Sequence, residues 1–253
     1  MDKIERAVAL IRSSRKTIVL TGAGISTESG IPDFRSPGTG LWEKIDPMEV
    51  LSTKALYQNP EHFYQVGFQM LISMDDAEPN KAHEILTKLE REGYIDLLVT
   101  QNIDNLHQKA GSMEVLEVHG HTRSCYCLNC GMEVSMVDMN RILQKGEIPP
   151  KCPDCEGTLR PSVVLFGDSL PPCFDRAWSE VENGELLIVI GSSLEVGPVN
   201  YLANICKQLM IINLGRTTYD QQADLLIQGS ASQILEQIYE KLHGNKGNLN
   251  ECL

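Results

Sequence analysis

Residues 17–42 read TIVLTGAGISTESGIPDFRSPGTGLW, and the expected architecture is built outward from them. The apolar run 18–20 is typical of a short buried strand. Gly22 and Gly24 follow it, and glycine allows the backbone to turn sharply and to approach a ligand closely. A strand, a glycine turn and a helix start form the phosphate-binding half of a dinucleotide site, because the free N–H groups of the helix start attract a pyrophosphate.

The segment after the glycine turn combines an incomplete fingerprint with several functional side chains. Thr27 occupies the third glycine position of the usual G-x-G-x-x-G pattern, so the motif alone also fits an ordinary strand–helix turn. Asp33, Phe34 and Arg35 then place an acid, an aromatic ring and a guanidinium in a loop that is too polar and glycine-rich to be core. We expect this loop, residues 33–42, to close over a ligand.

The composition is that of a globular protein with an acidic surface. The chain has 253 residues, 42% of them apolar, and a formal net charge of −12. It has no apolar run long enough to span a membrane and no signal peptide, so a cytoplasmic protein is expected. The charge disfavours nucleic-acid binding and favours a lysine-bearing peptide at long range, although solubility is the simpler reason for it.

Short apolar runs recur along the chain with helical stretches between them. They are near-continuous rather than alternating, as in strands that are covered on both faces. The runs lie at 18–20, 95–99, 115–118, 163–166, 186–190, 211–214 and 225–227, and the helical stretches at 82–92, 201–209 and 231–242. This alternation predicts an α/β fold, a Rossmann-like doubly wound parallel sheet that binds ligands at the carboxyl ends of its strands.

Two insertions interrupt this pattern and define the expected domains. Residues 43–80 lack strand character and predict the end of the loop followed by short helices that pack on the main sheet. Residues 121–158 hold five cysteines and few large apolar side chains, so this module needs a metal staple. The remaining segments, 1–42, 81–120 and 159–253, form the expected Rossmann-like domain.

The cysteine module contains two C-x-x-C pairs, which are Cys127 with Cys130 and Cys152 with Cys155. Four thiolates at this spacing close tetrahedrally around zinc and leave no open position, so a structural zinc is expected. A redox pair or idle thiols are the alternatives, and Cys125 is a second choice of ligand beside Cys127.

Polar residues follow several of the predicted strands. A carboxamide and ribose hydroxyls could be recognised by Gln101, Asn102 and Asp104, whereas helix capping would explain only one of the three. Small polar groups suited to phosphate and ribose stand at 191–193 and at Asn213. His119 follows the run 115–118 and is a candidate general base, in competition with His107, His121 and a purely structural role.

Taken together, these motifs resemble the sirtuin family of NAD-dependent protein lysine deacylases, in its bacterial or archaeal form. The resemblance covers about residues 15 to 235 in order and spacing. It is carried by the two cysteine pairs and by GAGIS and GIPDFR within 22–35, TQNIDNLH at 100–107, HG at 119–120, VVLFGD at 163–168, GSSLEV at 191–196 and INLG at 212–215.

The resemblance implies NAD as co-substrate, a structural zinc, and a cleft that acyl-lysine proteins or peptides enter opposite NAD. It assigns cofactor binding to Gly22, Ala23, Gly24, Ser26, Asp33, Phe34, Arg35, Gln101, Asn102, Ile103, Asp104, Gly191, Ser192, Ser193, Asn213 and Ala231. It assigns substrate binding to Val164, Phe166, Gly167 and Asp168, and catalysis to His119 and Asn102. No nucleic-acid or membrane partner is implied.

The same resemblance implies the chemistry. Nicotinamide leaves the ribose, the acyl oxygen attacks that carbon, and His119 activates a ribose hydroxyl, giving lysine and acylated ADP-ribose. Members that prefer succinyl or malonyl groups carry a Tyr-x-x-Arg pair, whereas this chain has Tyr64 and Gly67, so a neutral acyl group, most simply acetyl, is expected. Protein mono-ADP-ribosylation and a non-catalytic NAD-sensing zinc protein remain the alternatives.

Overall fold

The computed structural model describes residues 2–33 and 46–244, and its core is a six-stranded parallel sheet. The strand order is β3-β2-β1-β7-β8-β9, with every neighbouring pair parallel. The bounds are β1 Thr17–Thr21, β2 Leu97–Thr100, β3 Val115–Glu117, β7 Leu186–Ile190, β8 Leu209–Asn213 and β9 Leu225–Gln228. This is the doubly wound order, which reverses between β1 and β7, and it confirms the predicted Rossmann-like fold class.

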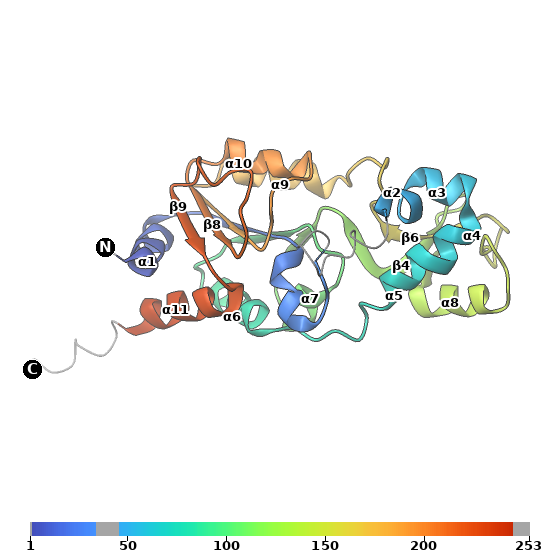
Figure 1. Cartoon of the computed structure of the whole chain (residues 1–253), viewed down its shortest axis with the longest axis horizontal. Coiled ribbons are helices and arrows are strands. Elements are labelled where there is room, and N and C mark those ends of the chain that lie inside the picture. Colours follow the sequence, from blue (N-terminus) through green and yellow to red (C-terminus); the bar gives the residue numbers. More distant parts are fainter. Residues whose placement is uncertain (1, 34–45, 245–253) are drawn as a thin grey trace, which may run out of the picture.

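Helices cover both faces of this sheet, as the continuous apolar strands require (Figure 1). One face packs against α1 Lys3–Ser13, α6 Lys81–Arg91 and α11 Ala231–His243. The other packs against α9 Cys173–Glu182, η5 Val199–Tyr201 and α10 Leu202–Ile205. The predicted helix 201–209 is shorter in the structure, where α10 ends at Ile205 and Leu209 already starts β8. None of the described helices is both long and apolar enough to cross a bilayer.

The glycine turn after β1 does not open an α-helix. It leads into two short 3₁₀ turns, η1 Ala23–Ile25 and η2 Thr27–Ser29. The expected helix start is wrong in this respect, because the N–H of Gly24 is bonded across the switch point to Gly191 O at 2.8 Å. Any anion held here must rely on single backbone N–H groups rather than on the dipole of a long helix.

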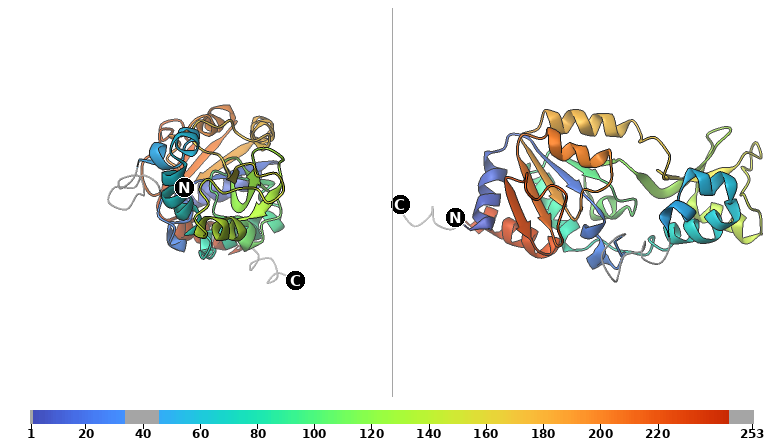
Figure 2. Two further views of the ribbon diagram at one scale, coloured as in Figure 1. Left: turned by 90° about the vertical axis from the view of Figure 1, so that its right-hand side faces the viewer. Right: turned by 45° about the horizontal axis from the view of Figure 1, so that its top comes forward.

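A second unit lies beyond the carboxyl edge of the sheet, at the right-hand end of Figure 1 and of the right view in Figure 2. Its antiparallel sheet has the order β5-β4-β6 and packs against α8. The short helix α7 Leu106–Ala110, which precedes these strands in the sequence, belongs to the first unit. The bounds are β4 Gly120–Cys127, β5 Glu133–Ser135, β6 Leu159–Val163 and α8 Met136–Gln144. The expectation that residues 163–166 form a strand of the main sheet is wrong, because the strand in this region, β6, ends at Val163 and pairs with β4.

The helical insertion completes this second unit instead of packing on the main sheet, so that expectation is also wrong. Its elements are α2 Pro47–Val50, α3 Thr53–Gln58, α4 Pro60–His62, the π-helical turn η4 Phe63–Gly67 and α5 Phe68–Ile72. Phe63, Tyr64 and Phe68 are buried in one cluster with Cys125 and Met139 of the cysteine module. The module is poor in large apolar side chains, and the insertion supplies them.

Three glycines meet where the strand order reverses. Gly22 N donates to Ile190 O at 3.0 Å, beside the bond from Gly24 N to Gly191 O. A Cβ on Gly24 would lie 2.9 Å from Gly191 Cα, and a Cβ on Gly191 would lie 2.3 Å from Ile25 N. Gly191 also has φ +64°, which favours glycine. The glycines therefore serve the crossing of two turns as well as the approach of a ligand.

Gly191→Ala is expected to lower the free energy of unfolding by about 2–5 kcal/mol, because left-handed strain and a backbone clash add together. The measurement is urea denaturation at neutral pH. Gly244→Ala is the matched control, because a Cβ there meets nothing within 4 Å, and it should change stability by less than about 0.5 kcal/mol. Equal stability of the two variants would show that the crossing is not tight.

Candidate active site

A cavity of about 1320 Å³ lies at the carboxyl edge of the main sheet and is closed on its far side by the chain that leaves the second unit. Every strand of the main sheet from β1 to β9 contributes its following residues to the wall. Of the residues predicted for the site, the wall contains Gly22, Ala23, Gly24, Asp33, Gln101, Asn102, Ile103, His119, Val164, Phe166, Gly167, Asp168, Gly191, Ser192, Ser193, Asn213 and Ala231. One concave surface thus gathers segments that are far apart in the sequence.

His119 lines this cavity and has one ring nitrogen without a hydrogen-bond partner among residues 2–33 and 46–244. Its Nδ1 lies 2.9 Å from Gln101 O, and a carbonyl can only accept, so Nδ1 carries the proton. The remaining nitrogen, Nε2, is then a lone-pair acceptor. Burial lowers the pKa of His119 from its ordinary value, although the bond to Gln101 O opposes this shift. The imidazole is therefore neutral near pH 7 and can take a proton from a substrate.

His107 and His121, which competed with His119 in the sequence, do not line the cavity. The His107 side chain is buried against β1, where Nε2 lies 2.9 Å from Thr21 Oγ1. His121 is partly exposed on β4, and its Nδ1 accepts from Arg123 N. Among these three, only His119 offers a nitrogen to the cavity.

The Asn102 carboxamide has a fixed orientation. Its Nδ2 donates to Gly22 O at 3.2 Å and to Ser26 Oγ at 3.1 Å. Gly22 O can only accept, and the Ser26 hydroxyl proton already goes to Asp104 Oδ2 at 2.6 Å, so Nδ2 must be the atom that faces them. Asn102 Oδ1 is therefore the polar atom that remains for a ligand.

Ser26 and Asp104 stand behind the cavity wall instead of in it. The Ser26 side chain is 0% exposed, and Asp104 is buried as well. Asp104 accepts from Ser26 Oγ and from Leu106 N, while burial raises the pKa of its carboxyl group. Both residues hold Asn102 and its loop, and neither reaches the cavity surface in this structure.

The wall nearest β8 and β9 is formed by Asn213, Leu214, Gly215, Arg216, Gly229, Ser230 and Ala231. Gln101 Nε2 donates to Ser192 Oγ at 2.9 Å, which ties the loops after β2 and β7 together. At the far end, Ser230 Oγ donates to Glu28 Oε1 at 2.6 Å, beside Ala231. This end therefore carries a carboxylate, Glu28, and a guanidinium, Arg216, beside its small polar groups.

Residues 164–168 form a strap along the opposite wall, which ends in a turn closed by the bond from Asp168 N to Leu165 O at 2.9 Å. Val164 N donates to His119 O at 2.9 Å, and Phe166 N donates to Leu51 O at 3.0 Å, so each of the two units holds one part of the strap. Asp168 is paired with the buried Arg160 at 2.6 Å and also accepts from Leu165 N. Its carboxylate shapes the strap and is not free to bind a cation.

Sequence reasoning missed the apolar part of the wall. Leu51, Met70, Leu71 and Met74 line the cavity from the helical insertion, and Val196 lines it from the loop after β7. Their only signal was apolar character in a segment without strands, which could not show that they face a cavity. Phe34 and Arg35, predicted to bind NAD, lie outside the described residues.

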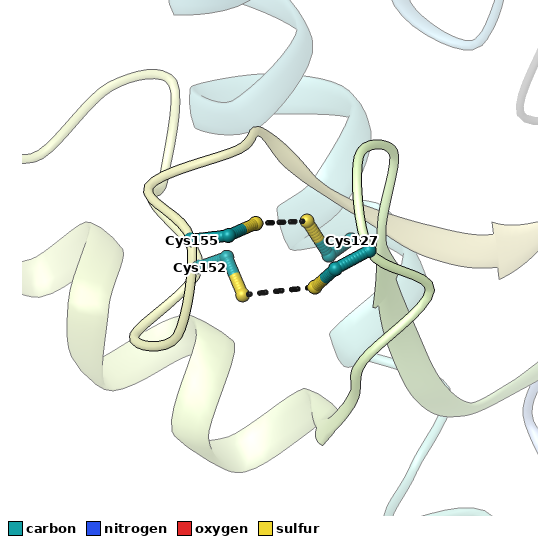
Figure 3. Close-up of side chains that lie close together, drawn as sticks. Cys127, Cys152 and Cys155 are labelled. Carbon is teal, nitrogen blue, oxygen red and sulfur yellow. Dashed lines mark hydrogen bonds between the residues drawn. The ribbon is translucent and has the colours of Figure 1, made fainter.

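The four predicted zinc ligands converge in the second unit (Figure 3). Their Sγ atoms all lie within 4.8 Å of one another, with Cys127 and Cys155 at 3.5 Å and Cys130 and Cys152 at 3.7 Å. Tetrahedral zinc with Zn–S bonds of about 2.3 Å requires sulfurs about 3.8 Å apart, so the donor set fits. Cys125 is not one of the four, because its thiol lies against Met136 Sδ at 3.2 Å.

Comparison with known proteins agrees with this geometry. The Sir2 family model matches residues 22–198. A protein named NAD-dependent protein deacetylase 2 from Caldanaerobacter subterraneus subsp. tengcongensis is 60% identical over 235 residues, which cover 93% of this chain and 94% of that protein.

Two solved structures resemble the whole chain. One is a Sir2 variant with a deacetylated p53 peptide and 3'-O-acetyl ADP-ribose, with a TM-score of 0.90, 38% identity and coverage of 95% of this chain and 98% of that one. The other is Sir2 with a p53 peptide and NAD⁺, with a TM-score of 0.87, 37% identity and the same coverage.

Cys152→Ser is expected to abolish zinc binding and to loosen the second unit, because three ligands hold a structural zinc poorly and the module has little core of its own. The measurement is the zinc content of purified protein by elemental analysis, about one ion per chain in the unaltered protein. Cys125→Ser is the control and should keep its zinc. Loss of zinc in the control instead would identify Cys125 as a ligand.

Proposed function

The chain belongs to the Sir2 family and its activity is NAD-dependent protein deacetylation, and we propose that His119 and Asn102 perform this reaction in the cavity between the two units. The observation that carries the proposal is that His119, whose Nε2 has no partner in the described part of the chain, lines the same cavity as the glycine turn and Asn102. In this proposal the large sheet and its helices bind NAD, and the strap holds the acyl-lysine segment.

The chemistry supplied by NAD is an electrophilic ribose carbon once nicotinamide departs, together with hydroxyls that accept the acyl group. Asn102 Oδ1 orients the groups around that carbon, because its amide protons are already bonded within the protein. His119 Nε2 takes the proton of a ribose hydroxyl that attacks the acyl carbon. The apolar wall from the helical insertion keeps water away from the reacting carbon.

We propose acetyl or another neutral acyl group as the one removed. Tyr64 is 1% exposed and donates its hydroxyl to Leu159 O at 2.6 Å, so it does not face the cavity. A Cβ on Gly67 would lie 2.2 Å from Val50 O, so no arginine fits at that position. With neither partner available, a charged acyl group would lose its hydration without compensation.

The partners that follow are acyl-lysine proteins or peptides. The net charge of −12 attracts a lysine-rich segment over long range. We propose action in the cytoplasm, without nucleic-acid or membrane binding, on the basis of this charge and of the sequence.

Matched peptides that differ only in one acyl-lysine test the function. With NAD, the acetyl peptide should give free lysine, nicotinamide and acetylated ADP-ribose, whereas the succinyl peptide should react at least about tenfold more slowly, because a buried carboxylate without a partner is costly. Mass spectrometry of both products is the measurement. ADP-ribose attached to protein would point to ADP-ribosyl transfer instead, and equal rates would refute the acyl preference.

His119→Ala is expected to lower kcat by about 10²- to 10⁴-fold, because it removes the general base. His121→Ala, a histidine replaced two positions away, should stay within about twofold. Both variants are compared at pH 7.5 with saturating NAD and acetyl peptide, after their zinc content and melting temperature are checked. Full activity of His119→Ala would disprove its role.

The pH profile follows from the same base. Burial disfavours the imidazolium and lowers the pKa of His119, and the reaction needs the neutral ring. Activity is therefore present above this pKa and falls as the pH drops through it, so kcat/KM should have an acid midpoint below pH 6.5. A midpoint above pH 6.5 would contradict this assignment.

A further inference from the structure

A buried chain of hydrogen bonds links His107 to the backbone of Asn102. His107 Nε2 lies 2.9 Å from Thr21 Oγ1, Thr21 donates to Thr100 Oγ1 at 2.8 Å, and Thr100 Oγ1 accepts from Asn102 N at 3.0 Å. The three side chains on this path are at most 2% exposed. The path therefore runs from α7 across the ends of β1 and β2 to the loop that carries Asn102.

The direction of these bonds fixes the protonation of His107. The hydroxyl proton of Thr21 is given to Thr100, so Thr21 Oγ1 can only accept from His107, and Nε2 must carry the proton. Its Nδ1 is then a lone-pair acceptor, buried and without a partner among the described residues. A leucine would fill this space without burying an unsatisfied nitrogen, so packing alone does not account for the histidine.

His83 packs edge-on against His107, without a hydrogen bond between the two rings, on the side of the glycine turn. Its Nδ1 lies 3.3 Å from Asn80 N and 3.1 Å from Asn80 Oδ1, and its ring lies 4.8 Å from that of His107, centroid to centroid. Asn80 Nδ2 donates to Ile25 O at 2.7 Å and to Ser29 Oγ at 3.0 Å, which anchors the 3₁₀ turns after β1. Burial lowers the pKa of His83 to about 4 and that of His107 well below its ordinary value, so both rings are neutral.

We propose that His107 is a positioning residue for deacetylation, which holds Asn102 in place through the hydroxyls of Thr21 and Thr100. Residues 102–105 have no regular secondary structure, and Thr100 Oγ1 holds the backbone N–H of Asn102 in addition to the two bonds that its Nδ2 makes. A small displacement of Asn102 moves its Oδ1 from the ribose carbon, and catalysis is sensitive to such shifts. This inference rests on the role given to Asn102 under the proposed function.

Two nearly isosteric variants break the chain without touching the cavity. Thr100→Val and Thr21→Val each remove one hydroxyl, and both should lower kcat at saturating NAD by about tenfold while the KM for the acetyl peptide stays within about twofold. Thr17→Val is the matched control, because Thr17 is a buried threonine at the opposite end of β1, and its kcat should stay within about twofold.

Substitutions of the histidine itself separate positioning from packing. His107→Gln keeps a donor near the place of Nε2 and should recover most of kcat, whereas His107→Leu should match Thr100→Val. The melting temperature of each variant is measured beside kcat. The inference is overturned when folded His107→Leu and Thr100→Val both keep the unaltered kcat, or when kcat falls only in step with the folded fraction.

Asn102→Ala distinguishes the two levels of the argument. Loss of activity in Asn102→Ala together with normal activity in Thr100→Val would refute the positioning role of His107 and leave the proposed function standing. Normal activity in Asn102→Ala would refute the role given to Asn102 itself, and with it the reason for holding its backbone.

Discussion

The close contact of two backbone turns at the switch point sets the geometry of everything around the cavity. Gly24 N and Gly191 O are 2.8 Å apart, and no side chain fits between the turns that carry them. Because β1 and β7 are neighbours, this contact brings the loops after both strands to one edge of the sheet. Asn102 is bonded to Gly22 O, so the loop after β2 is drawn to the same point. The width of the cavity is thus fixed by backbone atoms, which tolerate little change.

A second constraint joins the two units at the proposed base. The chain enters the cysteine module of the second unit through His119 and Gly120 and leaves it through Val163 and Val164. Gly120 pairs with Val163 in the small sheet, and Val164 N donates to His119 O at 2.9 Å. The four cysteines and the helical insertion therefore lie in the unit whose sheet is joined to the backbone of His119, the base in our proposal.

The sequence predicted those parts of the fold and site that depend on local pattern. Buried parallel strands are continuous apolar runs, so the strands could be predicted from the sequence. The spacing of the two cysteine pairs fits a tetrahedral ion best, so the zinc site could be predicted as well. Short apolar helices carry no mark of their partner, which is why Phe63 and Phe68 were placed on the wrong sheet. Residue spacing also cannot show how deeply a side chain is buried. Ser26 and Asp104 were predicted as ligand contacts, although in the structure the Ser26 hydroxyl donates to the Asp104 carboxylate behind Asn102.

Two histidines near this site, His119 and His107, differ in what their partners allow them to do. A backbone carbonyl fixes the proton of His119 on Nδ1 and leaves Nε2 for a substrate. The Thr21 hydroxyl donates to Thr100 and can only accept from His107, so the His107 proton is on Nε2. Its Nδ1 is buried and has no hydrogen-bond partner among the described residues. The same side chain is thereby suited to proton transfer in one place and to holding a loop in the other. On our proposals, the choice is made by the partner's remaining hydrogen-bonding capacity, since desolvation keeps both rings neutral.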